Sequence, residues 1–534
     1  MNKIGLFIVT LLMAAMGLNV MAQTSDAVLR DKITNAAMKV YDDYLAENPN
    51  DYNTLFARAH QQYYNGDYLA ALTDVNQAML LTPKTDKDLR FDEHILRARI
   101  SIARNDYSSA IADLRLAKEL KPKSLPCIDL MGKTYLKAGN LDEAEKAFKT
   151  ILRAESMNYD AMYGLALVEQ GRNNPQAAIE QVNKAVGLFR AEPQVFVNRA
   201  DIYARQGNID AAVADLLQGM SVGNGGESVQ RLFDLSDTNY DAVMRSLSDL
   251  ANKTNDPGMY RYLRASIAMD HHRYGQALRD LNFIKNNHLY NSDLVYFSIA
   301  KCCLELGRYE QALTHATRAL DMDMSQPEYY LVKALAQYHM DEGNHCDEAM
   351  QTLMACSDIA PQFVPMLLTK AAILVKQGKD NEALGYLNAA VANEPGNAEA
   401  LFSRAALLKK LDYPLLATKD FSTMTLLSDD PSDLKGVGLS ELGRDNDAFD
   451  WLGKITATSQ PGGENDIYAA LFMALRGDNF KALEYVRKAL ENGYGSLYRL
   501  LYDDLSPLNF NSLRNDPGFQ LEIEKAQRNF VESD

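Results

Sequence analysis

Few residues in this sequence have the types and the spacing that chemistry requires. The segment Gly219-Met220-Ser221-Val222-Gly223 matches G-x-S-x-G, the turn that presents a nucleophilic serine in many hydrolases. That turn must join a strand to a helix, whereas this segment ends a helical pattern and is followed by more glycines. We therefore interpret it as a linker. A hydrolase with a site near Ser221 stays as the less favoured alternative.

The histidines and cysteines form no recognisable metal or redox pattern. His271 and His272 are adjacent, and His272 stands at a turn, so we expect both to be structural. Neither H-E-x-x-H nor G-x-x-x-x-G-K occurs. The sequence therefore predicts no catalytic residue, no metal and no cofactor. Five irregularly spaced cysteines are expected to be small buried apolar residues, not a disulfide framework: Cys127, Cys302, Cys303, Cys346 and Cys356.

The composition excludes several functional classes. The 534 residues are 47% hydrophobic and 24% charged, which is typical of a folded soluble protein. The formal net charge is −16, and such a surface repels phosphate backbones, so no nucleic-acid partner is expected.

The first residues have the pattern of a secretory signal. Lys3 gives a short positive segment, residues 4–16 are mostly apolar, and Val20-Met21-Ala22 favours cleavage after Ala22. An uncleaved membrane anchor is the alternative. The pattern resembles a bacterial signal and predicts an exported protein, with the periplasm as its location. Membrane association is expected only through partners or through an uncleaved signal.

A short turn pattern recurs about every 34 residues. Asn65-Gly66-Asp67-Tyr68 returns as Arg104-Asn105-Asp106-Tyr107, and thirteen such turns extend to Gly477. A chain that reverses between two helices favours positive φ, which Gly, Asn, Asp and His tolerate best. The turn positions are Gly66, Asn105, Gly139, Gly171, Gly207, Asn239 (degenerate), His272, Gly307, Gly343, Gly378, Asp412, Gly443 and Gly477.

Small residues keep a fixed distance from these turns. Ala or Gly stands seven residues before the turn, as at Ala59 and Gly132, and Arg231 is the exception. Ala stands five residues after most turns, as at Ala71. Small residues on both helices let two backbones approach closely, so the sequence predicts an all-α fold of about thirteen helix-turn-helix repeats.

This pattern resembles the tetratricopeptide repeat (TPR) family over about residues 48–495. The resemblance implies antiparallel helix pairs stacked into a right-handed superhelical solenoid with a concave groove. The sequence departs from the family in one respect. The Trp that is usual in the first helix of a repeat is missing, because the only Trp, Trp451, lies in a second helix.

A weak repeat interrupts the array and predicts a bend between two sub-arrays. The leading helix has apolar residues at helical spacing, including Val40 and Tyr44, and is expected to cover the first repeat. Leu513 and Phe519 are expected to be buried in the cap. The expected parts are a signal peptide (1–22), a leading capping helix (26–47), repeats one to five (48–220), a degenerate repeat or hinge (221–256), repeats seven to thirteen (257–495) and a C-terminal cap (496–534).

The family resemblance also implies which first-helix positions face the groove. Aromatic and basic residues at these positions suit a protein or peptide partner. The candidate groove residues are Phe56, His60, Tyr63, Tyr64, Arg99, Lys133, Lys137, Tyr262, Phe297 and Lys301. The favoured hypothesis is a non-enzymatic exported scaffold that binds a protein or peptide there. A structural assembly factor of an envelope complex is the alternative, and the oligomeric state stays open.

Overall fold

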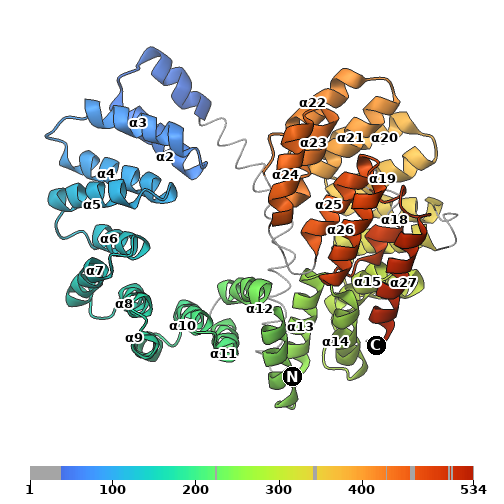
Figure 1. The fold of residues 1–534 in the computed structure, drawn as a ribbon, viewed down its shortest axis with the longest axis horizontal. Coiled ribbons are helices and arrows are strands. Elements are labelled where there is room, and N and C mark those ends of the chain that lie inside the picture. The colour runs from blue at the N-terminus through green and yellow to red at the C-terminus, as the bar shows by residue number, and fades with distance from the viewer. Residues whose placement is uncertain are drawn as a thin grey trace. The chain divides into compact units, whose positions relative to one another are not determined.

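The computed structural model of the protein is built from helices (Figure 1). It describes residues 38–222, 225–340, 346–428, 430–457, 463–502, 506 and 509–532. Within these ranges no residue forms a β-strand, and no helix has the length and apolarity needed to cross a membrane. The predicted signal peptide lies outside the described residues.

The chain divides into two compact blocks, with the boundary between Leu232 and Phe233. The N-terminal block begins with helix 38–47 and continues with α2 (Tyr52–Tyr64), α3 (Tyr68–Leu81), α4 (Lys87–Ala103), α5 (Tyr107–Leu120), α6 (Leu125–Lys137), α7 (Leu141–Ala154), α8 (Tyr159–Gly171), α9 (Pro175–Leu188), α10 (Pro193–Arg205) and α11 (Ile209–Met220).

Helix α12 (Gly226–Asn252) crosses the block boundary. The C-terminal block continues with α13 (Gly258–Asp270), α14 (Tyr274–Asn286), α15 (Asp293–Glu305), α16 (Tyr309–Met322), α17 (Pro327–His339), α18 (Cys346–Ile359), α19 (Val364–Lys376), α20 (Asp380–Asn393), α21 (Ala398–Lys410), α22 (Pro414–Met424), η1 (Pro431–Asp433), α23 (Lys435–Glu441), α24 (Asp445–Ala457), α25 (Glu464–Leu475), α26 (Asn479–Glu491), η2 (Tyr498–Tyr502) and α27 (Pro517–Glu532).

Ten of the predicted turn positions have a left-handed backbone, with φ from +55° at His272 to +82° at Gly66. The prediction for Gly171 is wrong, because this residue ends α8 and the left-handed residue is Asn173, with φ of +63°. Ala178 thus stands the usual five residues after its turn. Gly343 lies outside the described residues.

The small residues lie where the two helices of a repeat cross. Ala59 and Ala71 are both fully buried, as the spacing predicts. Around Phe148 the packing is closer still, because a Cβ atom at Gly164 would lie 2.5 Å from its ring and one at Gly132 would lie 2.8 Å away. The Phe148 ring therefore fills the space that two missing side chains leave free.

The degenerate repeat has no left-handed turn. Helix α12 runs through it with a kink at Asn239, whose φ is −136°. Its two arms replace the usual helix pair, and the boundary between the blocks falls inside the segment 221–256. The bend itself stays a prediction.

The two ends of the array differ in how well the sequence predicts them. Val40 is 66% exposed and Tyr44 is also exposed, so the predicted buried face of the leading helix is wrong. Leu45 packs against the first repeat instead. The burial predicted for Leu513 and Phe519 is confirmed, since both are fully buried.

The side chain of Asp516 caps the N-terminus of α27, the last helix of the C-terminal cap. The Oδ1 atom of Asp516 accepts hydrogen bonds from the backbone N–H groups of Gly518 at 2.8 Å and Phe519 at 3.0 Å. Pro517 is the first helical residue, a position that needs no N–H donor. The sequence Asp516-Pro517-Gly518-Phe519 thus starts α27 and directs Phe519 into the core.

Candidate functional site

Aromatic side chains of α2 form a connected row on the N-terminal block. The ring centroids of Phe56 and His60 are 6.2 Å apart, and those of His60 and Tyr64 are 4.9 Å apart. Tyr63 joins the row through Tyr64, with 5.5 Å between the ring centroids. Residues four apart share a helix face, so the structure brings these four predicted residues together.

Arg99 on α4 extends this row into the second repeat. Burial, and after it the charge of Arg99, lower the pKa of His60, so its imidazole is neutral at pH 7. His60 and Arg99 are exposed, and Tyr64 is 65% exposed. We call Phe56, His60, Tyr63, Tyr64 and Arg99 the aromatic row. Its rings offer contact area, and its guanidinium offers a bidentate partner for a carboxylate.

The two predicted lysines of the third repeat differ in their surroundings. Both Lys133 and Lys137 are exposed on α6, one helical turn apart. The Nζ atom of Lys133 lies 2.7 Å from an oxygen of Asp129 on the same helix, which offsets its charge. Such exposed pairs contribute little binding or stability.

Three predicted groove residues lie in the C-terminal block, and one of them is buried. Tyr262 is 1% exposed, and burial raises its pKa to about 12, opposed by a hydrogen bond with Ser298. Its prediction as an open groove residue is therefore wrong, because it packs between α13 and α15. Phe297 is half-buried against Tyr329, with ring centroids 4.6 Å apart, and Lys301 is exposed.

In the C-terminal block, the C-terminal ends of several first helices contact the segment 494–498 of the same chain. The Oγ atom of Ser496 donates to Glu305 at 2.6 Å, and Glu305 stands two residues before the turn at Gly307. The ring centroids of His272 and Tyr494 are 5.2 Å apart, and those of His339 and Tyr498 are also 5.2 Å apart. The segment 494–498 thus covers positions in three successive repeats.

A cavity of about 450 Å³ lies beyond this contact, on the groove face of α19 and α21. Leu368, Val375 and Lys410 form part of its wall, and Tyr498 and Asn509 line it from the C-terminal segment. The Nζ atom of Lys410 is 2.8 Å from Asp380, so this cation already has a partner. The cavity is mostly apolar and is shared with the chain's own tail.

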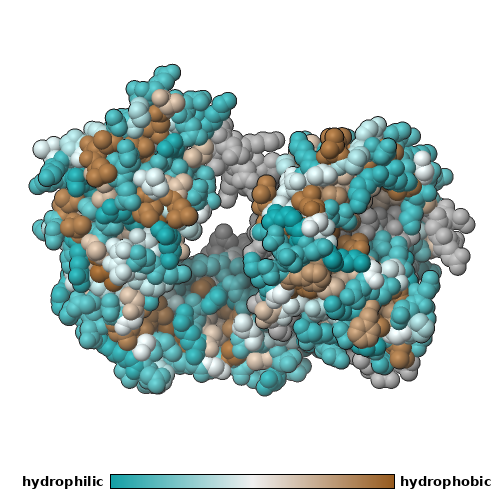
Figure 2. Space-filling model, turned by 45° about the horizontal axis from the view of Figure 1, so that its top comes forward, coloured by the Kyte–Doolittle hydropathy of each residue, from teal (hydrophilic) through white to brown (hydrophobic). Residues whose placement is uncertain are grey.

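The surface outside these sites is mixed. Figure 2 shows apolar side chains dispersed among hydrophilic ones on the visible face. Exposed apolar residues such as Leu80, Leu415 and Phe480 stand on second helices. Scattered residues of this kind are normal and indicate no binding site.

Comparison with known proteins identifies the repeats. A family model described as "Tetratricopeptide repeat" matches residues 130–193, 166–220 and 262–345. Its matches fall in both blocks and on helix pairs that turn at left-handed residues. The chain contains tetratricopeptide repeats. The fold class predicted from the sequence is thereby confirmed.

Two curated relatives show how far this TPR protein resembles others. It is 23% identical over 435 residues to DnaJ homolog subfamily C member 3 of Gallus gallus, covering 75% of this chain and 79% of that one. It is 35% identical over 95 residues to the tetratricopeptide repeat and J domain-containing co-chaperone DNJ1 of Fusarium oxysporum. That second match covers 17% of this chain and 18% of the relative.

Solved structures also align with this TPR protein. Naa15/Naa10 bound to HypK-THB is 12% identical, covers 98% of this chain and 96% of the aligned one, and has a TM-score of 0.31. A tetratricopeptide repeat protein from Parabacteroides merdae is 16% identical, with coverage of 46% and 99% and a TM-score of 0.24.

The hydrolase alternative has no geometric support at Ser221. This residue caps the end of α11, and its Oγ atom donates to the backbone carbonyl oxygen of Gln218 at 2.7 Å. A nucleophile elbow needs a strand before the serine, and within the described ranges the chain forms none.

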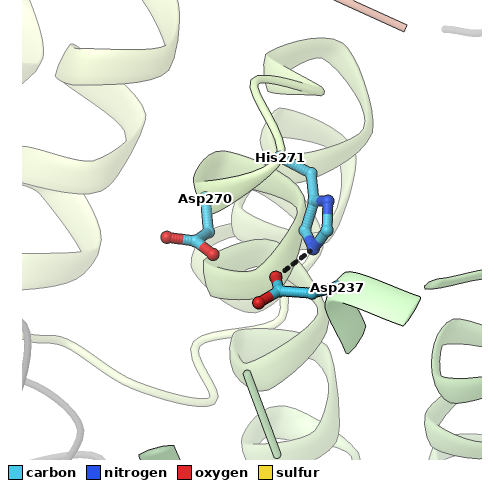
Figure 3. A group of neighbouring side chains, drawn as sticks. All are labelled: Asp237, Asp270 and His271. Atoms are coloured by element: carbon cyan, nitrogen blue, oxygen red, sulfur yellow. Dashed lines mark ion pairs between the residues drawn. The ribbon is translucent and has the colours of Figure 1, made fainter. Parts of the chain in front are cut away.

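Two features of this TPR protein escaped the sequence analysis. The contact of the tail with Glu305 joins residues 191 apart, and no local pattern indicates it. The second feature is a group of metal-ligating side chains, Asp237, Asp270 and His271 (Figure 3). A signal for it existed, because both aspartates stand two residues before a turn position in consecutive repeats.

Proposed function

We propose that this TPR protein is an exported, non-enzymatic scaffold that binds a protein or peptide through the aromatic row of its N-terminal block. The observation that carries this is the run of Phe56, His60 and Tyr64 with Arg99 beside it, in which His60, Tyr64 and Arg99 are exposed and Phe56 is half-buried. Equivalent helix ends of the C-terminal block already contact the chain's own segment 494–498. The aromatic row is therefore the better candidate for an external partner.

The chemistry of the aromatic row specifies the kind of partner. Tyr and His rings contribute contact area at a low entropic cost, and Arg99 contributes a planar donor pair for a carboxylate. A peptide segment that presents an apolar or aromatic side chain and, next to it, an Asp or Glu side chain meets both demands. The name of the Fusarium relative, a co-chaperone, supports a protein partner for this chain as well.

Export to the periplasm belongs to the same proposal. Its support is the Lys3, apolar and Ala22 pattern of residues 1–22. Fractionation of cells that express the full chain tests it, combined with N-terminal sequencing of the mature protein. Recovery of protein that retains Met1 in the cytoplasm would contradict export without touching the partner-binding proposal.

Site-specific photo-cross-linking tests the binding proposal directly. A photoreactive phenylalanine analogue replaces Tyr64, and the matched control replaces Leu80, which is 83% exposed on α3. We expect a discrete cross-linked protein from position 64 and none from position 80. Equal labelling from both positions would show that capture does not depend on the aromatic row.

Affinity measurement with the identified partner completes the test. Arg99→Glu should weaken binding by about tenfold or more, since it replaces a carboxylate partner with a like charge. Arg104→Glu, an exposed change at the end of α4, is the control and should leave the affinity unchanged. Far-UV circular dichroism of both variants verifies that the helices are intact. An unchanged affinity in Arg99→Glu would overturn the assignment of the aromatic row.

A further inference from the structure

Three side chains that ligate metals converge between α12 and α13. The ligand atoms of Asp237, Asp270 and His271 all lie within 4.8 Å of one another. Figure 3 shows the carboxylate of Asp237 directed at the imidazole of His271, with the carboxylate of Asp270 to one side. The Nε2 atom of His271 is 3.7 Å from Oδ1 of Asp237. His271 is 4% exposed, while both aspartates reach the surface.

Both carboxylates stand near the C-terminal end of a helix or of a helix arm, where a negative charge is unfavourable. Asp270 is the last residue of α13, and Asp237 is two residues before the kink that ends the first arm of α12. Helix C-termini carry a partial negative charge from unpaired carbonyl groups. Burial, and then the neighbouring charge of Asp237, raise the pKa of Asp270, in line with this crowding. The two carboxylates thus bring negative charge together at this place.

The imidazole of His271 faces only acceptors at its Nε2 atom. Ser236 has one hydroxyl hydrogen, and its Oγ atom lies 2.7 Å from the carbonyl oxygen of Phe233, which takes that hydrogen. The same Oγ atom is 3.0 Å from Nε2 of His271, and Oδ1 of Asp237 lies on the same side. Oxygen atoms gathered around one ring nitrogen require either its N–H hydrogen or a cation.

The nearby cations do not offset the negative charge of the two carboxylates. The guanidinium of Arg273 lies over the ring of Tyr240, with 4.0 Å to the centroid. His272, and to a smaller extent Lys301, lower the pKa of Asp270 through their charges, but burial and the charge of Asp237 outweigh them. Glu464, whose carboxylate also raises the pKa of Asp270, adds further negative charge to the group.

We propose that Asp237, Asp270 and His271 bind a divalent transition-metal ion of the Zn²⁺ type. The imidazole nitrogen is a borderline ligand that suits Zn²⁺ better than Mg²⁺, and Zn²⁺ also accepts carboxylate oxygens. Bond lengths of about 2.0–2.1 Å place tetrahedral ligands about 3.4 Å apart, so the carboxylates need to move inward by about 1 Å. Their exposure allows this movement, and water supplies the remaining coordination.

The bound ion joins the degenerate repeat to the next one. Asp237 lies at the end of the first arm of α12, whereas Asp270 and His271 end α13, so coordination links this arm to the C-terminal end of α13. Repeat arrays rely on contacts between neighbouring repeats for their stability. The ion therefore acts as a structural link, and the site carries no catalytic step.

Isothermal titration calorimetry of the tag-free full-length protein, freed of metal with EDTA, tests this proposal. ZnCl₂ should show one site that Asp237→Asn and Asp270→Asn each weaken by about tenfold or more, because each removes one of three protein ligands. MgCl₂ in the same concentration range should give no comparable heat. The two Asn variants alter exposed side chains, so their folding is expected to be intact.

Asp249→Asn, on the second arm of α12, is the matched control and should bind Zn²⁺ as the unmodified chain does. Thermal unfolding of each protein with and without ZnCl₂ gives a second readout, and only the unmodified chain and the control should gain stability. Zn²⁺ heats that are equal in all four proteins would overturn the proposal, since other groups would then bind the ion. Absence of a Zn²⁺ site in the unmodified chain would overturn it as well.

Discussion

Arg97 holds the buried carboxylate of Asp113 with two hydrogen bonds, from Nε at 2.8 Å and from Nη2 at 2.6 Å. Its third donor, Nη1, reaches Asn76 in the preceding repeat at 2.9 Å. One guanidinium thus joins both helices of its own repeat and a helix of the previous one. Ion pairs at the same positions, with Arg eight residues before the turn and Asp eight residues after it, occur as Arg58–Asp74, Arg199–Asp215, Arg264–Asp280 and Arg404–Asp420.

Removal of this guanidinium should destabilise the N-terminal block. Asp113 is 4% exposed, and Arg97→Ala leaves its charge with His94 alone. We expect a loss of about 3 kcal/mol in the free energy of unfolding, typical for breaking one side of a buried pair. Urea unfolding followed by far-UV circular dichroism measures it. Arg99→Ala, two residues away and exposed, should change stability by less than about 0.5 kcal/mol, and equal losses in both would contradict the link.

The spacing of 16 residues between these Arg and Asp partners was visible in the sequence. The small residues and the turns predict the fold more directly, because they decide whether two helices can approach each other. Repeat number, turn positions and helix pairing follow from such local patterns. The Arg–Asp links occur in only some repeats, so a pattern defined by what all repeats share does not include these links.

Asn105 tests the backbone requirement at the turns. Its φ of +60° is unfavourable for an L-residue with a Cβ atom, and Asn tolerates it better than Ala. Asn105→Gly should be neutral or stabilising, whereas Asn105→Ala should cost about 1 kcal/mol. Thermal unfolding of both variants measures the difference. Greater stability in the Ala variant would show that the turn does not depend on backbone conformation.

Gly164 tests the close packing around Phe148. A Cβ atom at Gly164 would lie 2.5 Å from the buried ring, so Gly164→Ala should cost about 1–3 kcal/mol through overpacking. Phe148→Leu removes the ring edge, and the double variant should therefore lose less than the sum of the single changes. Denaturant unfolding of the three variants gives the coupling. Additive losses would contradict direct contact.

The groove was harder to predict than the repeats. Position along a first helix predicts which residues face the groove, and on α2 it selected Phe56, His60, Tyr63 and Tyr64, whose rings lie close together. Position alone does not show which other parts of the chain contact the same helix face. Tyr262 is buried between helices, and Glu305 is bonded to Ser496 far along the chain. Such long-range contacts depend on how the array folds back, which no single repeat encodes.

The buried His271 makes the stability of the C-terminal block depend on pH. Burial first, and then the charges of Arg273 and His272, lower its pKa to about 4, against about 6.5 in an unfolded chain. Between these values the unfolded chain binds a proton that the folded one does not, so the free energy of unfolding decreases as the pH falls. The loss should reach about 2 kcal/mol at pH 5. Asp237 and Asp270 act in the opposite direction, because their pKa values are raised and their protonation favours the folded state.

Urea unfolding of metal-free protein at pH 7 and pH 5, followed through the fluorescence of the buried Trp451, isolates the C-terminal block. The His271→Gln variant should lose less stability over this interval than the unmodified chain, and an equal loss in both would assign the pH dependence to other groups.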